Sequence, residues 1–139
     1  MIICDTSALI AVYGTDQPAQ GQVERVLKSD PGPLVLSPFV LAELDYIVNR
    51  AARVSGELTM LTDVATGVYT LAEFSRGDVA QAAAVIERYA DNNIGLADAS
   101  IVVLAARYAT TRVLTFDERH FRAIRPLHAD AFTILPADA

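Results

Sequence analysis

The chain has 139 residues, of which 53% are hydrophobic and 20% are charged, and its formal net charge is −6. This length fits one domain spanning residues 1–139, because a single core serves ~100–200 residues. The hydrophobic content excludes a disordered chain, and no apolar run reaches the ~18 residues of a membrane-spanning helix. Cys4 is the only cysteine, which excludes an internal disulfide and a cysteine-rich zinc site. No secretory leader is visible, so we expect a soluble protein of the reducing cytoplasm.

Short apolar runs alternate with longer helical patterns from the first residue onward. This alternation indicates βαβ units and an α/β fold with a mainly parallel sheet. Five runs are rich in β-branched or aromatic residues or are bounded by turn residues, and we predict them as strands: Ile2–Cys4, Leu34–Ser37, Val68–Ala72, Arg112–Phe116 and Phe132–Leu135.

Helices are predicted in the intervals between these strands. The first begins near Ser7, and the second and third follow Pro18 and Pro38, because proline is accepted in a first helical turn. The remaining signals are an end of the third helix at Ser55-Gly56, a fourth helix to about Thr66, a fifth after Asp78, and a sixth from near Ala97 to around Tyr108.

Three aspartates stand where a carboxylate has two possible roles. Asp5 and Asp117 each end a predicted strand, and both of them and Asp98 stand near helix starts. Taken singly, each is best explained as a helix cap. Taken together they suggest a site, because the carboxyl ends of parallel strands and the helix starts that follow them meet at one edge of the sheet.

Glu43 is harder to explain as a cap, since it lies inside the helical run Phe39–Val48. Its neighbours at helical spacing are apolar or aromatic, so it must be desolvated unless it lies at the edge of the packed face. Asp45 lies ~200° away around the helix, so only one of the two can join a given site. Periodicity alone does not choose between Glu43 and Asp45.

Converging carboxylates repel one another, and either raised pKa values or a cation must offset the repulsion. Oxygen ligands select a hard ion, Mg²⁺ or Mn²⁺. Such an ion supports phosphodiester hydrolysis by activating water and stabilising charge on phosphate and leaving oxygens. The hydroxyls of Thr6, Ser7 and Thr115 could orient ligands or water, although capping explains them equally well.

Other chemistry finds little support in the residues. No glycine-rich phosphate loop occurs, and His120 is interpreted as a surface or capping residue. A signalling receiver domain needs a lysine at a late strand end, whereas the only lysine, Lys28, falls in the second helix. Five arginines against two acids between Arg107 and His128 could contact phosphates, with Arg119 and Arg122 as candidates, but a solvated surface is the favoured interpretation.

Four stretches, "IICDTSALIA", "SPFVLAELDYIV", "IGLADASIVVLAARY" and "VLTFDERHF", together resemble the PIN-domain ribonucleases, and specifically the VapC toxins of bacterial VapBC toxin–antitoxin pairs. The resemblance covers nearly the whole chain. It implies a three-layer α/β/α sandwich and a metal-dependent endoribonuclease site. Its acidic residues match Asp5, Glu43, Asp98 and Asp117, so the resemblance selects Glu43 over Asp45.

The resemblance also implies partners and substrates. A homodimer is expected, together with a small VapB-type antitoxin whose basic tail enters the active-site groove. Expected substrates are structured RNAs, either transfer RNA or the sarcin–ricin loop of ribosomal RNA. The alternative is a PIN-fold interaction module without catalysis, which the four acids argue against but do not exclude.

Overall fold

The strands form one parallel sheet that reverses its order at β1. The computed structural model describes residues 1–139. Its strands are β1 (Ile2–Cys4), β2 (Leu34–Leu36), β3 (Thr70–Leu71), β4 (Arg112–Leu114) and β5 (Thr133–Leu135), in the order β3-β2-β1-β4-β5. All four pairings are parallel. Because β1 lies between β2 and β4, the strand order reverses beside its carboxyl end, which is where open α/β sheets form ligand crevices.

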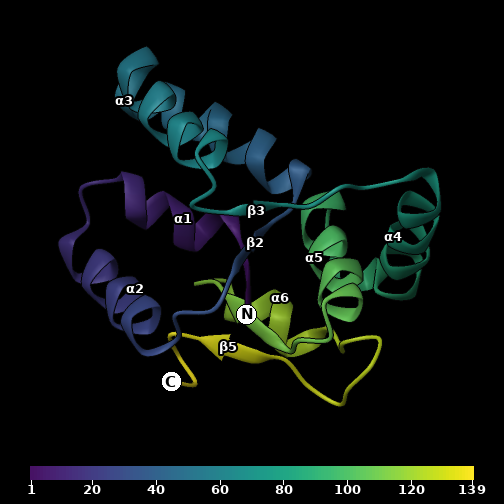
Figure 1. Cartoon of the computed structure of the whole chain (residues 1–139). Coiled ribbons are helices and arrows are strands. Elements are labelled where there is room, and N and C mark those ends of the chain that lie inside the picture. Colours follow the sequence, from purple (N-terminus) through teal and green to yellow (C-terminus); the bar gives the residue numbers. More distant parts are fainter.

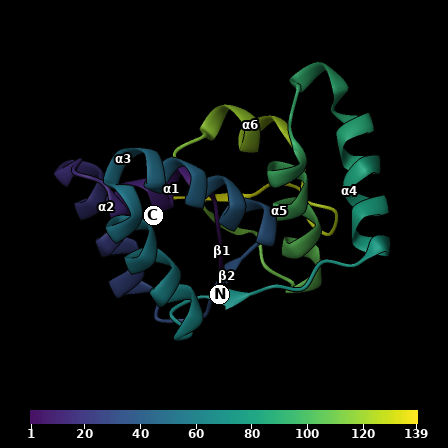
Figure 2. The same cartoon turned by 90° about the horizontal axis from the view of Figure 1, so that it is seen from above.

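Helices cover both sides of the sheet, which confirms the predicted three-layer α/β/α architecture. Figure 1 shows α1 (Thr6–Tyr13) and α2 (Gln17–Ser29) on one side, with α4 (Arg76–Arg88) and α5 (Leu96–Arg107) on the other. The long α3 (Pro38–Ala65) packs on α1 and α5. Seen from above in Figure 2, α6 (Glu118–Ala123) lies beside α5. A 3₁₀ turn, η1 (Ala90–Asn92), precedes α5.

The middle of the sheet and α5 form the centre of the core. All three residues of β1, Cys4 included, are fully buried. In α5, every residue from Ala99 to Ala105 is buried, as expected of a helix that is apolar on all sides. The two buried hydroxyls at this contact, Ser37 and Ser100, satisfy each other at 2.6 Å. This rigid centre fixes the first residues after β1 and the first turn of α5.

The structure confirms two helical stretches where two helices were expected, and a kink separates them within α3. The predicted boundary at Ser55-Gly56 lies just after the observed one, because the single non-helical residue of α3 is Arg53, with φ 59° and ψ −164°, and the second stretch continues to Ala65. The ribbon doubles back at this point (Figure 1). Gly56 follows the bend closely, and a Cβ on it would lie 2.3 Å from the Cβ of Ala52. The glycine therefore permits the close approach after the bend rather than ending the helix.

Two further expectations differ in extent. The strand expected at Val68–Ala72 is reduced to Thr70–Leu71, an exposed pair at the sheet edge. A helix start was expected near Asp117, but the bounds of α6 were not predicted, because six residues are too few for a clear apolar period. None of the helices has the length and apolar character needed to cross a membrane.

Candidate active site

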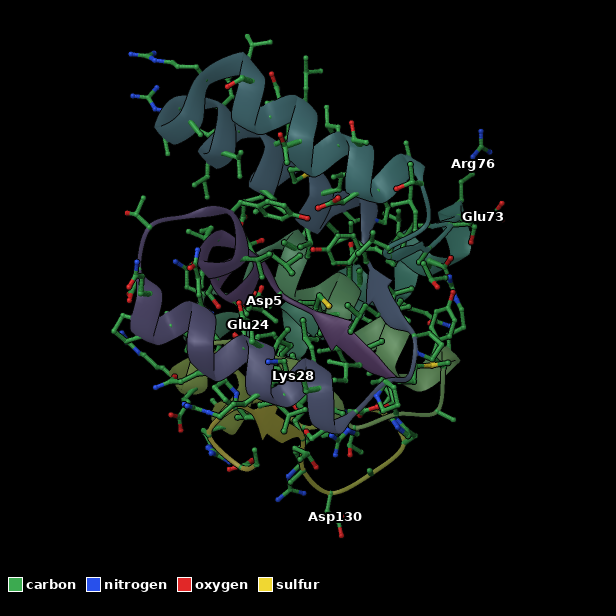
Figure 3. The ribbon with its side chains drawn as sticks, turned by 60° about the vertical axis from the view of Figure 1, so that its left-hand side comes forward. Asp5, Glu24, Lys28, Glu73, Arg76 and Asp130 are labelled. Atoms are coloured by element: carbon green, nitrogen blue, oxygen red, sulfur yellow. The ribbon has the colours of Figure 1, made fainter.

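Asp5 occupies the carboxyl end of β1 and is 5% exposed. Its backbone N–H donates to the carbonyl of Leu114 at 2.9 Å, so the ladder between β1 and β4 holds it. Two hydroxyls donate to its Oδ2, from Ser7 at 2.8 Å and from Thr115 at 2.7 Å. Figure 3 shows Asp5 where the purple strand runs into α1. Strand pairing and two hydroxyl donors thus fix this carboxylate.

Asp98 and Asp117 meet around the imidazole of His120. Asp98 lies in the first turn of α5, and Asp117 lies immediately before α6. The Nδ1 of His120 is 2.8 Å from an oxygen of Asp98 and 3.1 Å from an oxygen of Asp117. Two carboxylates from different elements are therefore brought within contact of one ring.

Glu43 completes a single acidic cavity with a volume of about 350 Å³. The carboxylates that line it are Asp5, Glu43, Asp98 and Asp117, together with His120. Glu43 is exposed, at the edge of the packed face of α3, which explains how a charge is tolerated there. Asp45 is absent from this lining and faces Glu57 instead. The structure thus brings the four predicted acids together and leaves Asp45 outside.

Helix capping does not account for these aspartates as a group. Asp5 stands at the N-cap of α1, yet its side chain makes no capping hydrogen bond. Gly95 is the N-cap of α5, so Asp98 is not a cap at all. Only Asp117 caps its helix, by accepting the N–H of His120 at 3.2 Å. Helix capping, which the sequence favoured for each aspartate taken singly, therefore explains only one of the three.

The structure corrects the interpretation of His120 as a surface or capping residue. Its side chain is 28% exposed and lies between two carboxylates rather than on a solvated surface. The signal that could have found it is the spacing to Asp117, since residues three apart share one side of a helix. The spacing was not used because no bounds were predicted for this short helix.

Comparison with known proteins identifies the family. The sequence profile of the PIN domain matches residues 2–126. The chain is 43% identical to ribonuclease VapC26 of Mycobacterium tuberculosis over 135 residues, which cover 97% of this chain and all of that protein. This chain belongs to the VapC ribonucleases of the PIN-domain family. The resemblance carried by the four sequence motifs is confirmed.

Solved structures agree with this PIN fold. The sarcin–ricin-loop-cleaving toxin VapC20 of M. tuberculosis superposes with a TM-score of 0.77 at 20% identity, over 84% of this chain and 90% of that one. VapBC2 of Rickettsia felis, bound to a DNA fragment from its promoter, gives a TM-score of 0.67 at 21% identity, over 91% and 96%. At these identities the likeness concerns the fold.

The electrostatics of the PIN-domain cavity are those of crowded carboxylates. Burial, and next the charge of Asp5, raise the pKa of Asp98 to about 6, although the hydrogen bond from His120 opposes the rise. Burial also raises the pKa of Asp5, against the two hydroxyl donors that lower it. Both carboxylates therefore hold their charge at a cost that a bound cation would relieve.

The donor set fits a divalent cation. Oxygen or nitrogen atoms of Asp98, Asp117 and His120 all lie within 4.8 Å of one another. The hydroxyl oxygen of Thr6, which also lines the cavity, is buried and has no hydrogen-bond partner. An orphaned buried hydroxyl beside carboxylates suits a bound ion or its water. Ser7 and Thr115, in contrast, contact Asp5 directly.

The arginine-rich stretch is mostly engaged within this PIN domain. Arg107 pairs with Asp78, Arg112 pairs with Asp30, and Arg122 pairs with both Glu118 and Asp138. Arg119 is exposed and forms no ion pair. Of the two arginines predicted to contact phosphate, Arg119 alone presents an uncommitted charge.

Proposed function

We propose that this VapC chain is the toxin of a type II toxin–antitoxin pair and acts as an Mg²⁺- or Mn²⁺-dependent endoribonuclease on structured RNA. The observation that supports this most strongly is the gathering of four carboxylates in one cavity at the point where the sheet order reverses. These carboxylates come from the end of β1, from α3, from α5 and from the residue before α6, and helix capping explains only one of the three aspartates.

The residues that would hold the ion are Asp5, Asp98 and Asp117, with Glu43 at the rim of the cavity and His120 beside two of them. When bound, the ion lowers the pKa of water and stabilises negative charge at the phosphate and leaving oxygen. The chain positions this chemistry. The hydroxyls of Ser7 and Thr115 hold the carboxylate of Asp5, while the ladder to β4 holds its backbone.

His120 holds two of the carboxylates in place. Its Nδ1 contacts Asp98 on α5 and Asp117 before α6, so it links the start of α5 to the start of α6. Outer partners of this kind typically account for ~10–100-fold in metal affinity or activity. We therefore assign His120 the positioning of Asp98 and Asp117.

The RNA substrate is proposed to be the sarcin–ricin loop or transfer RNA. The loop is the first to test because it is the substrate of VapC20, whose fold this chain shares. The test compares cleavage of a synthetic sarcin–ricin stem-loop and of unmodified transfer RNAs by wild-type protein with Mg²⁺, with Mn²⁺ and with EDTA. One cut site in one RNA, lost in EDTA, is expected; no cleavage of any RNA by folded protein would refute the proposal.

The partner is proposed to be a VapB-type antitoxin that covers the acidic cavity of a VapC homodimer in the cytoplasm. A net charge of −6 and four carboxylates in the cavity suit a basic segment. The test adds a purified candidate VapB-type antitoxin to the cleavage reaction. Stoichiometric loss of cleavage is expected, and unchanged cleavage by a demonstrated complex would contradict the proposal.

A further inference from the structure

Phe116 is an exposed aromatic residue whose backbone is fixed to the acidic site. Its side chain is 38% exposed. Its N–H donates to the hydroxyl oxygen of Ser7 at 2.9 Å, and that hydroxyl donates to Asp5 at 2.8 Å. The preceding residue, Thr115, also donates to Asp5. A single exposed aromatic is common on protein surfaces, but this one is held two hydrogen bonds from a site carboxylate.

Two cavities meet at Phe116. One, of about 540 Å³, is lined by Phe116 together with Ser7 and Ile10, which also line the acidic cavity. The other, of about 510 Å³, lies between α2 and the segment after β5, where Phe116 and Thr115 face Gln22, Arg25 and Ser29. A continuous lining therefore leads from the carboxylates past Phe116 to α2.

The cavity beside α2 contains an uncommitted cation. Arg25 is exposed and makes no ion pair, in contrast to Arg107, Arg112 and Arg122. Figure 3 shows α2, with Glu24 and Lys28 labelled, on the same side of the molecule as Asp5. The lining thus offers an aromatic ring, an unpaired guanidinium and neutral hydrogen-bonding groups, and its one acidic side chain, Glu118, is paired with Arg122.

We infer that Phe116 is a stacking platform for an unpaired nucleobase of the RNA substrate beside the cleaved phosphate, with Arg25 contacting the same nucleotide. The inference rests on the proposed function. Sequence-specific recognition of RNA uses unpaired bases that stack on aromatic side chains or on arginine. The volume of the cavity is that of a small-ligand site. A protein segment is the other conceivable occupant, but continuity with the carboxylates that would act on phosphate favours the nucleotide.

The chain contains no tryptophan, so Phe116→Trp introduces a single tryptophan whose emission can be excited selectively over the five tyrosines. The variant is made in an Asp98→Asn background to prevent cleavage, and it is titrated with a single-stranded RNA octamer of mixed sequence. Saturable quenching is expected, and it should weaken when the octamer carries abasic sites. The matched control is Leu127→Trp, at a residue 47% exposed in a separate cavity against α4, and its emission should not respond.

Affinity measured in the same background gives the second test. Phe116→Ala is expected to weaken octamer binding ~5–100-fold, the effect of losing one stacked base, and Phe116→Tyr should restore it. Arg25→Ala should weaken binding further and reduce its salt dependence. Leu127→Ala is the control and should bind like the parent.

The outcomes separate this inference from the proposed function. If wild-type protein cleaves RNA with metal but Phe116→Trp is not quenched and Phe116→Ala binds normally, the stacking site is refuted and the nuclease stands. If Phe116→Ala weakens only the antitoxin complex, the face binds protein and the inference is wrong. Absence of cleavage by the wild type would count against the proposed function itself.

Discussion

Asp98 lies in the candidate active site and, when ionised, destabilises the fold. It is half-buried, contacts His120, and lies close enough to Asp5 for their charges to interact. Its pKa is raised to about 6, chiefly by burial. A folded protein that favours the protonated acid is destabilised when the acid ionises. The charge at this position is therefore maintained against stability, which is typical of residues selected for chemistry.

Asp98→Asn should abolish cleavage and stabilise the metal-free fold. The amide keeps the shape and a hydrogen bond to His120 but removes a charge, so at pH 7 we expect ~1–2 kcal/mol of added stability after allowance for solvent screening. Urea unfolding in EDTA measures this. The control is Asp130→Asn, an exposed residue that Figure 3 shows pointing away from the protein, which should change neither property. A destabilised Asp98→Asn protein would mean that this aspartate is structural.

The pH dependence follows from the same shift. Since the folded pKa of about 6 exceeds the ordinary 3.8, the destabilisation is absent below pH ~4, grows as the pH rises toward 6, and is complete above it. A divalent ion needs the ionised form and relieves the repulsion. Mn²⁺ should thus raise the melting temperature more at pH 7.5 than at pH 5. Equal shifts at both pH values, or a larger one at pH 5, would contradict metal binding by these acids.

At the scale of elements, α3 contains the most strained backbone position. Arg53 has φ 59° and ψ −164°, a combination that is almost confined to glycine. The bend lets the second half of the run return, and Asn49 before it bonds Glu57 after it at 3.0 Å. Glu43 lies in the first half, so the position of α3 affects the acidic cavity.

Arg53→Gly should therefore stabilise the protein by ~1 kcal/mol or more, because glycine adopts this conformation without strain. Arg50→Gly is the matched control. It places glycine in the regular helix three residues earlier and should destabilise by ~1 kcal/mol. Chemical denaturation of both variants measures the difference. If Arg53→Gly were the less stable of the two, the bend would not be a strained feature of the folded state.

The elements also show which features a sequence can predict. Strand β1 was predicted at its observed bounds, and β2, β4 and β5 within one or two residues, because short apolar runs between turn residues are a direct signal of buried strands. A helix break was predicted at Ser55-Gly56, but its position at Arg53 was not, since nothing in arginine indicates a positive φ. The acids Asp5, Asp98 and Asp117 could be proposed from strand ends and helix starts alone. Glu43 needed the family resemblance, and His120 needed the fold.

For the whole molecule, an acidic chain has to bind a polyanion. Its net charge is −6, and Arg107, Arg112 and Arg122 are paired with carboxylates, so attraction to phosphate depends on few groups. Local cations beside the cavity then decide where RNA binds, and overall charge opposes binding elsewhere. This arrangement favours selective binding over general attraction.

Arg119→Glu should accordingly weaken RNA binding more than Arg122→Glu does. Arg119 has no ion-pair partner, whereas Arg122 is engaged by Glu118 and Asp138, and reversing its charge mainly disturbs that cluster. Affinity for the RNA octamer measured across salt concentrations tests this, with a shallower salt slope expected for Arg119→Glu. An unchanged affinity and slope would remove Arg119 from the RNA surface.

The most direct test of the central claim is cleavage of purified total RNA, with the fragment ends sequenced. Wild-type protein freed of antitoxin is incubated with Mg²⁺ or Mn²⁺, beside an EDTA control and the Asp98→Asn variant. We predict discrete cuts that require the metal and disappear in the variant. Cuts that persist in EDTA or in Asp98→Asn, or no cuts by folded wild-type protein, would contradict a metal-dependent nuclease built on these four acids.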